Sequence, residues 1–139
     1  MKTPATQPIE QHPLGFFLPE NTKLLMLGSF PPPRARWSMN FYYPNIQNDM
    51  WRILGLVFYN DKEYFLETKK AFSEEKAKAF CREKGIGIGD TAMEVIRLKA
   101  NASDKFLEVV RPIDPEKVLS QIPECVAIVV TGQKAMDTL

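Results

Sequence analysis

The chain has 139 residues, of which 45% are hydrophobic and 25% charged, and its formal net charge is +1. This is enough chain for one globular domain with a real core, and no apolar run approaches the roughly 20 residues that span a bilayer. The balanced charge argues against tight non-specific binding of nucleic acid, because dedicated binders carry a basic excess. A local basic patch stays open, since Arg34, Arg36 and Arg52 are close in sequence.

Residues 1–21 are predicted to form a proline-containing leader that docks on the domain through the apolar segment from Leu14 to Leu18. Its first eleven residues are polar and hold no apolar signal core, so we expect a cytoplasmic protein.

Metal and triad chemistry are poorly supported by the residue types. The chain has one histidine, His12, which we expect in a flexible leader, and two distant cysteines, Cys81 and Cys125. These residues cannot supply a spaced cluster of metal ligands, and a Ser/His/Asp triad would have to use His12. The cysteines are expected to be buried free thiols, as in a reducing compartment.

The first half of the chain predicts one strand followed by helices. Residues 23–27 form a short apolar run, typical of a strand covered on both faces, which Gly28-Ser29 and Pro31 to Pro33 end abruptly. From Asn45, apolar residues recur at helical spacing. Residues 61–84 predict a charged helical stretch whose second helix starts at Ser73. The apolar positions of the first helix are Ile46, Met50, Trp51, Ile53, Leu54 and Val57.

The second half alternates strands with helices. Residues 85–90 predict a strand whose alternating glycines leave one face bare for another backbone or a ligand, and Asp90 then predicts the N-cap of a helix through Ile96. Residues 101–110 are ambiguous. Pro115 predicts the start of a helix, and residues 126–130 a fully apolar strand before Thr131-Gly132 and a further helix.

This order predicts a single α/β domain over residues 1–139, a three-layer α/β/α sandwich with a central, mainly parallel sheet. Ligands of such sheets bind outside the carboxyl ends of the strands, which places residues 28–33, 89–90 and 131–132 around one crevice. Three parallel strands make a thin sheet, so we expect a C-terminal strand to be missing or supplied otherwise.

The candidate site centres on the loop from Gly28 to Pro33, the aromatic run from Phe41 to Pro44, and Asn48. The glycine permits close approach of a ligand, and the prolines keep the loop open. Aromatic rings beside a strand end can stack on a planar base, and an asparagine can hold a water or an exocyclic group.

Three motifs resemble the uracil-DNA glycosylase superfamily, closest to its hypoxanthine-DNA glycosylase-like branch. They are Leu27-Gly28-Ser29-Phe30-Pro31, Phe41-Tyr42-Tyr43-Pro44 and Asn48-Asp49-Met50-Trp51. The resemblance extends from about His12 to the end of the chain, through the strand ending at Asp90, the helix opening at Asp114-Pro115 and the strand ending at Thr131-Gly132.

The resemblance implies excision of a deaminated base, uracil or hypoxanthine, from DNA, with no metal or redox cofactor. It makes Asn48 the catalytic candidate, while Arg34 and Arg36 would contact the DNA backbone. The base would be held by the residues at the strand ends and by the aromatic rings, namely Gly28, Ser29, Phe30, Pro31, Tyr43, Thr131 and Gly132.

Two other functions stay open. Relatives usually carry Asn-Gly where this chain has Thr131-Gly132, and threonine offers only a hydroxyl, which favours a catalytically silent binding module of the same fold. A small-molecule nucleotide or nucleoside enzyme could use the same crevice. Asn48 and Asp90 could also be simple helix caps, and the glycines of residues 85–89 do not form a dinucleotide-binding motif.

Overall fold

The computed structural model describes residues 8–98 and 107–139. Its centre is a parallel sheet in the order β5-β2-β8, built from β2 (Leu24–Gly28), β5 (Ile86–Asp90) and β8 (Ala127–Val130). Leu27 lies opposite both Gly89 and Val130, so the three strands end at the same level. The three parallel strands expected at residues 23–27, 85–90 and 126–130 are therefore present.

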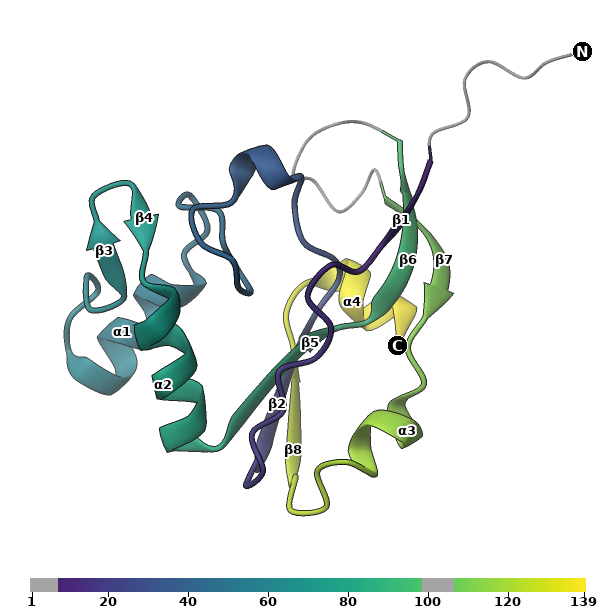
Figure 1. Ribbon diagram of the computed structural model, residues 1–139. Coiled ribbons are helices and arrows are strands. Elements are labelled where there is room, and N and C mark those ends of the chain that lie inside the picture. Colours follow the sequence, from purple (N-terminus) through teal and green to yellow (C-terminus); the bar gives the residue numbers. More distant parts are fainter. Residues whose placement is uncertain (1–7, 99–106) are drawn as a thin grey trace, which may run out of the picture.

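Helices pack on both faces of this sheet because successive residues of β2 point to opposite sides. Met26 faces a core that includes α1 (Met50–Tyr59) and α2 (Glu74–Lys84), whereas Leu25 packs with α3 (Pro115–Leu119). Figure 1 shows the three strands in the middle, with α1 and α2 on one side and α3 on the other.

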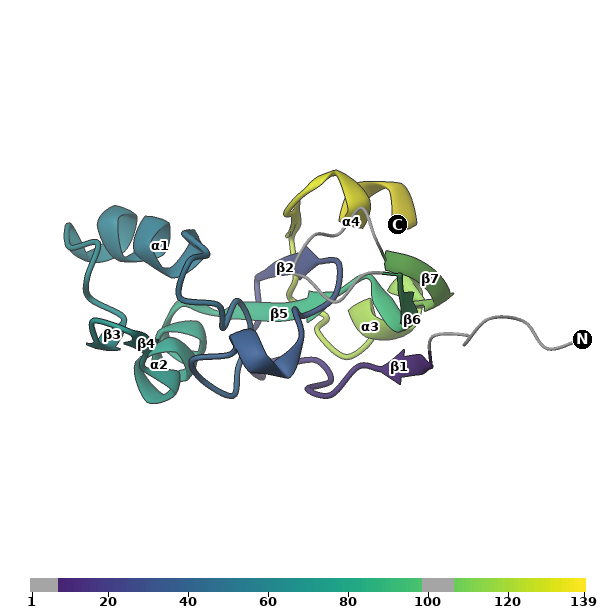
Figure 2. The same ribbon diagram turned by 90° about the horizontal axis from the view of Figure 1, so that it is seen from above.

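A second sheet, which the sequence did not predict, is antiparallel and has the order β1-β6-β7. It consists of β1 (Ile9–Gln11), β6 (Ala92–Arg97) and β7 (Leu107–Pro112). This sheet lies at the opposite end of the molecule from α1 and α2 (Figure 2).

The prediction that Asp90 caps a helix is therefore wrong. After Asp90 the backbone stays extended, because the amides of Thr91 and Ala92 donate to the carbonyls of Gly28 and Ser29. The ambiguous segment 101–110 is described only from Leu107, where it is strand β7; the rest of it lies outside the described residues.

Two helical boundaries also differ from the prediction. Residues 61–72 are not helical but contain a hairpin of β3 (Leu66–Thr68) and β4 (Ala71–Phe72), and Ser73 then caps α2 by accepting from the Lys76 amide. The first helix starts at Met50 rather than near Asn45.

The apolar spacing of α1 predicted its buried face only in part. Trp51 is fully buried, as expected, while Ile53 and Val57 are 52% and 68% exposed. The remaining elements are a short 3-10 helix, η1 (Arg34–Arg36), and α4 (Gln133–Thr138).

The leader docks on the sheet, as predicted. Phe17 forms an antiparallel bridge with Ile88 of β5, and the ring of Phe16 covers Gly89, where an added Cβ would lie 2.1 Å from that ring. The bare face of β5 is thus filled by the leader and not by a ligand.

Both cysteines are free thiols. Cys81 of α2 is fully buried, as expected, and burial raises the pKa of its thiol to about 12. Cys125 is only half-buried.

None of the helices in the described part of the chain is long and apolar enough to cross a membrane.

Candidate functional site

A cavity of about 350 Å³ opens at the carboxyl end of the parallel sheet. Gly28, Asp90 and Thr131 line it from the ends of β2, β5 and β8, so the three strand ends meet at one crevice as expected. Its other walls come from the loop 29–32 and from residues of the segment 42–50.

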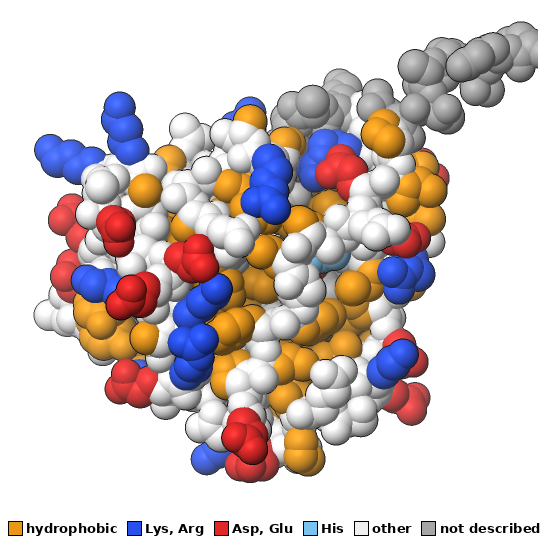
Figure 3. Space-filling view, viewed as in Figure 1, with side chains coloured by type: hydrophobic (Ala, Val, Ile, Leu, Met, Phe, Trp, Pro, Cys, Tyr) orange, Lys and Arg blue, Asp and Glu red, His pale blue; other side chains and the backbone are white. Residues whose placement is uncertain are grey.

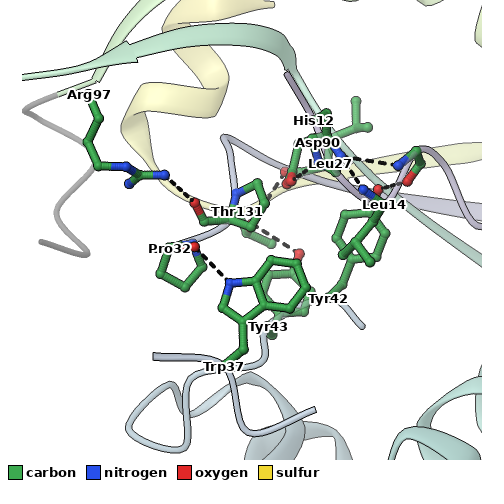
Figure 4. Close-up of polar contacts among 12 residues, drawn as sticks. His12, Leu14, Leu27, Pro32, Trp37, Tyr42, Tyr43, Asp90, Arg97 and Thr131 are labelled. Atoms are coloured by element: carbon green, nitrogen blue, oxygen red, sulfur yellow. Dashed lines mark hydrogen bonds and ion pairs between the residues drawn. The ribbon is translucent and has the colours of Figure 1, made fainter. Parts of the chain in front are cut away.

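Asp90, which lines the cavity, is one member of a buried pair that sequence reasoning missed. His12 is not part of a free leader: its Nε2 lies 2.6 Å from Oδ2 of Asp90, and both side chains are nearly fully buried (Figure 4). The two residues are 78 positions apart, so no local spacing could have indicated the contact.

The hydrogen bonds of His12 define its tautomer. Its Nδ1 accepts from the backbone amides of Leu14 and Gly15, both at 3.2 Å, so that nitrogen carries no proton. A neutral imidazole has one N–H, which must then be on Nε2. His12 therefore donates to the Asp90 carboxylate.

Two tyrosines stand beside this pair. Burial, with the negative charge of Asp90 adding to it, raises the pKa of Tyr42 and Tyr43 far above the ordinary phenol value, so both remain protonated donors. The Tyr42 hydroxyl donates to the Gly15 carbonyl and so holds the leader beside the cavity.

Tyr43 is held by the end of β8. Its hydroxyl lies 3.3 Å from Oγ1 of Thr131, and Thr131 donates to the Leu27 carbonyl, also at 3.3 Å. The Thr131 hydroxyl is therefore engaged in positioning Tyr43. Tyr43 has φ of 52°, a left-handed conformation that is costly for a bulky residue and is often retained at functional sites.

The loop after β2 is fixed from outside the cavity. Arg97 of β6 donates to the Pro31 carbonyl at 3.1 Å and pairs with Glu10, and Trp37 Nε1 donates to the Pro32 carbonyl at 2.7 Å. Phe30 lines the cavity with its ring edge-on to His12, at 5.3 Å between centroids.

Asn48 lies exposed at the rim of the cavity. Its Oδ1 accepts from the Met50 amide at 2.8 Å, which satisfies a free amide at the start of α1. The capping role considered from the sequence is thus present, alongside a position on the cavity wall.

The remaining predicted residues divide between the cavity and its surroundings. Ser29 and Pro31 line it, whereas Gly132, with φ of 99°, is not among the residues that do. Arg34 and Arg36 are exposed on η1. Arg34 stacks on Trp37 beside a second hollow that also includes Arg97.

Charge on the molecular surface is mixed. Lys and Arg side chains are interspersed with Asp and Glu on the face shown in Figure 3. Among residues 8–98 and 107–139, no group of three or more His, Cys, Asp and Glu side chains is placed to hold a metal ion.

Comparison with solved structures gives one close match of shape. It is the solution NMR structure of a protein from Methanosarcina acetivorans described as a "putative Uracil DNA glycosylase", with a TM-score of 0.66 and 24% sequence identity. The match covers 94% of this chain and 74% of that one. This chain has a uracil DNA glycosylase-like fold. No family model and no curated protein matches the sequence.

The residues at the strand ends could be predicted from the sequence, whereas the buried pair of His12 and Asp90 could not. Gly28 and Thr131 follow apolar strands directly, which is a local signal. Asp90 also ends a predicted strand, but it was interpreted as a helix cap, and no motif marks His12 as its partner. A signal for His12 does exist in retrospect: it precedes the apolar segment that docks the leader on β5.

Proposed function

We propose that the protein is a DNA glycosylase that hydrolyses the N-glycosidic bond of a deaminated base, uracil or hypoxanthine. The observation that carries this proposal is the aromatic-walled cavity at the three strand ends, with a buried carboxylate inside it, in a uracil DNA glycosylase-like fold. Enzymes that act on a base inside a duplex extrude it into such a pocket and recover the cost, a few kcal/mol, by stacking and hydrogen bonds.

In this proposal the loop after β2 holds the extruded nucleotide. Gly28 allows close approach, Ser29 and Pro31 contribute polar groups and shape, and the rings of Phe30 and Tyr43 provide the apolar walls against the base. Thr131 acts by holding Tyr43, and Gly132 by ending β8 beside it. The reaction needs no metal or redox cofactor.

Asn48 is the proposed catalytic residue. Because its Oδ1 is held by the Met50 amide, the side-chain amide is fixed at the cavity rim. There it would orient the water that attacks C1′ as positive charge develops on the sugar.

Arg34 and Arg36 are proposed to contact DNA phosphates next to the extruded nucleotide. Both lie exposed on η1, directly after the loop that lines the cavity. Replacing either by Ala should weaken binding equally for all sequences and lower the slope of log affinity against log salt by about 1.

We also propose that residues 1–139 act as one domain related to the hypoxanthine-DNA glycosylase-like branch. The protein would then take part in base excision repair in the cytoplasm.

Alkaline cleavage of labelled oligonucleotides containing uracil or hypoxanthine tests the proposal. Asn48→Ala should lower excision by roughly a hundredfold or more, as expected when a positioned catalytic group is removed. Gln121→Ala, which removes an exposed amide beyond the cavity, serves as the matched control.

One observation favours the catalytically silent binding module: the Asn48 side chain caps α1. If well-folded protein binds free base but excises none from either substrate, the enzyme proposal fails and this alternative replaces it.

A further inference from the structure

The turn of the β3–β4 hairpin presents two adjacent lysines that the proposed function has not used. Thr68 pairs with Ala71, so Lys69 and Lys70 form a two-residue turn, and both are exposed. The Lys70 amide donates to Oγ1 of Thr68 at 3.1 Å, which orders the turn. None of the ion pairs between described residues involves either lysine, including any with the neighbouring Glu67. Both ammonium groups are therefore available to a partner.

The hairpin is anchored on the segment that forms the cavity wall. The Phe72 amide, at the end of β4, donates to Oγ of Ser38 at 3.2 Å, and that hydroxyl donates to the carbonyl of Pro44, a lining residue, at 2.7 Å. The Phe72 ring is buried, with the guanidinium of Arg52 over it at 5.3 Å. Arg52 in turn donates to the Ile46 carbonyl. The hairpin, the cavity wall and the start of α1 thus form one connected unit.

This anchoring places the two lysines at the same end of the molecule as the cavity. Figure 1 shows the turn at the upper left, at the end of the molecule where β2 leads into η1. Lys and Arg side chains project from this corner in Figure 3. In both ribbon views η1, with Arg34 and Arg36, lies between the hairpin and the second sheet. The lysines therefore extend the basic surface of η1 beyond the cavity on the α1 side.

The phosphate backbone of DNA is a partner that fits this position. Duplex DNA carries one negative charge per about 1.7 Å of its axis, so DNA that leaves the cavity brings phosphates over the same end of the molecule. Lysine is a flexible point charge, which suits contact with a backbone of variable geometry. Because the formal net charge is only +1, attraction must come from such local groups.

We propose that Lys69 and Lys70 bind phosphates of the DNA beyond the extruded nucleotide, on one side of it. This inference rests on the proposed function in taking DNA as the ligand. It adds a second contact region, separate from the cavity and from η1, and it makes binding depend on the length of DNA on that side.

Binding to duplexes of graded length tests this contact. Duplexes with uracil or hypoxanthine, extended only 5′ or only 3′ of that base, would be titrated by fluorescence anisotropy. Extension on one side should strengthen binding by the native chain, and the double variant Lys69→Gln with Lys70→Gln should lose that gain. Its slope of log affinity against log salt should be smaller by about 2. The advantage of the native chain on long duplexes should therefore shrink about tenfold between about 50 and about 200 mM salt.

A matched variant separates the local contact from the change in net charge. Lys23→Gln with Lys117→Gln removes two exposed lysines, one just before β2 and one on α3, and should retain the one-sided gain and the native slope. Equal losses in the two double variants would overturn the proposal. So would a gain that is the same on both sides of the base, or one that survives in the hairpin variant.

Excision assays on the same duplexes distinguish this inference from the proposed function. A one-sided gain that depends on the hairpin lysines, without excision, would refute the glycosylase and leave the contact standing. Excision by a chain whose binding is the same in the hairpin variant would refute the contact and leave the glycosylase. If the chain neither binds nor cleaves any duplex, both are refuted.

Discussion

At the scale of single residues, the site depends on side chains whose polar atoms are used within the protein. Thr131 illustrates this: sequence reasoning placed it on the base, whereas its hydroxyl connects the Tyr43 phenol to the Leu27 carbonyl. Such a chain of hydrogen bonds keeps a strained tyrosine in one orientation. We therefore expect Thr131 to act on the ligand through Tyr43.

Thr131→Val tests this arrangement, since valine has nearly the same shape but no hydroxyl. Losing the bonds at Tyr43 and Leu27 should lower the free energy of unfolding by about 1 kcal/mol and weaken base binding. Urea denaturation and base titration measure the two effects. Thr131→Ser retains the hydroxyl and should resemble the native chain; equal losses in both variants would contradict the role given to the hydroxyl.

At the scale of elements, the leader completes the site as well as covering the sheet. The same stretch that places Phe16 over Gly89 and Phe17 beside Ile88 delivers His12 to Asp90. The bare face of β5 therefore serves to admit the leader. Disturbing that contact should reach the cavity indirectly.

Gly89→Ala should displace the Phe16 ring, because the new Cβ would lie 2.1 Å from it. Overpacking of this kind costs about 1–3 kcal/mol of stability, measured by denaturant unfolding. Faster hydrogen exchange at the Phe17 and Ile88 amides should accompany it, since these amides pair the leader with β5.

The double variant Phe16→Ala with Gly89→Ala controls for this mechanism. Removing the ring makes room for the Cβ, so the combined loss of stability should be smaller than the sum of the single losses. Additive losses would show that the two positions do not interact.

The sequence predicted elements where the signal is local. The two apolar runs and the Ile/Gly alternation of residues 85–90 became the parallel strands. Asp114 caps α3, its side chain accepting from the amides of Glu116 and Lys117. The second sheet was not predicted because no local pattern marks β6 as a strand. Its extended conformation depends on pairing with β1 and β7. Asp90 before an apolar stretch has the pattern of a helix cap, but pairing with the loop after β2 holds that stretch extended.

The site, too, was predicted only where the signal is local. The loop after β2 and the ends of β5 and β8 were placed correctly around one cavity, since parallel strands end on the same side. The His12–Asp90 pair was not predicted, because it joins a leader to a strand through tertiary packing alone.

At the scale of the whole molecule, the cavity lies where the two sheets meet. β5 of the parallel sheet ends at Asp90 and β6 of the antiparallel sheet begins two residues later, at Ala92. The interior contains buried protonated groups, notably Tyr42 and Tyr43 beside this junction and Cys81 on α2. Their burial makes the fold sensitive to alkali.

Stability should therefore fall as the pH rises above about 9. The folded chain raises the pKa of Cys81 from 9.0 to about 12, and those of Tyr42 and Tyr43 above 10.0. Below these ordinary values both states hold the protons and the stabilisation is complete; above them the unfolded chain releases protons that the folded chain keeps. Denaturant midpoints between pH 8 and 11 measure the loss.

Cys81→Ala is the control variant for the loss of folding stability at alkaline pH. It should show a shallower decline that begins nearer pH 10, where tyrosine ionises in the unfolded chain. Midpoints that stay constant to pH 11 in the native chain would contradict the burial of these protons.

The contact between His12 and Asp90 also determines when the site can form during synthesis. During synthesis His12 is made 78 residues before Asp90, and Phe16 and Phe17 must likewise wait for their partners on β5, Gly89 and Ile88. Contacts of such wide sequence separation form slowly, because a long loop must close before they are gained. The nascent chain thus exposes its aromatic leader until β5 has been made, and the cavity is finished only after Thr131 has been added at the end of β8.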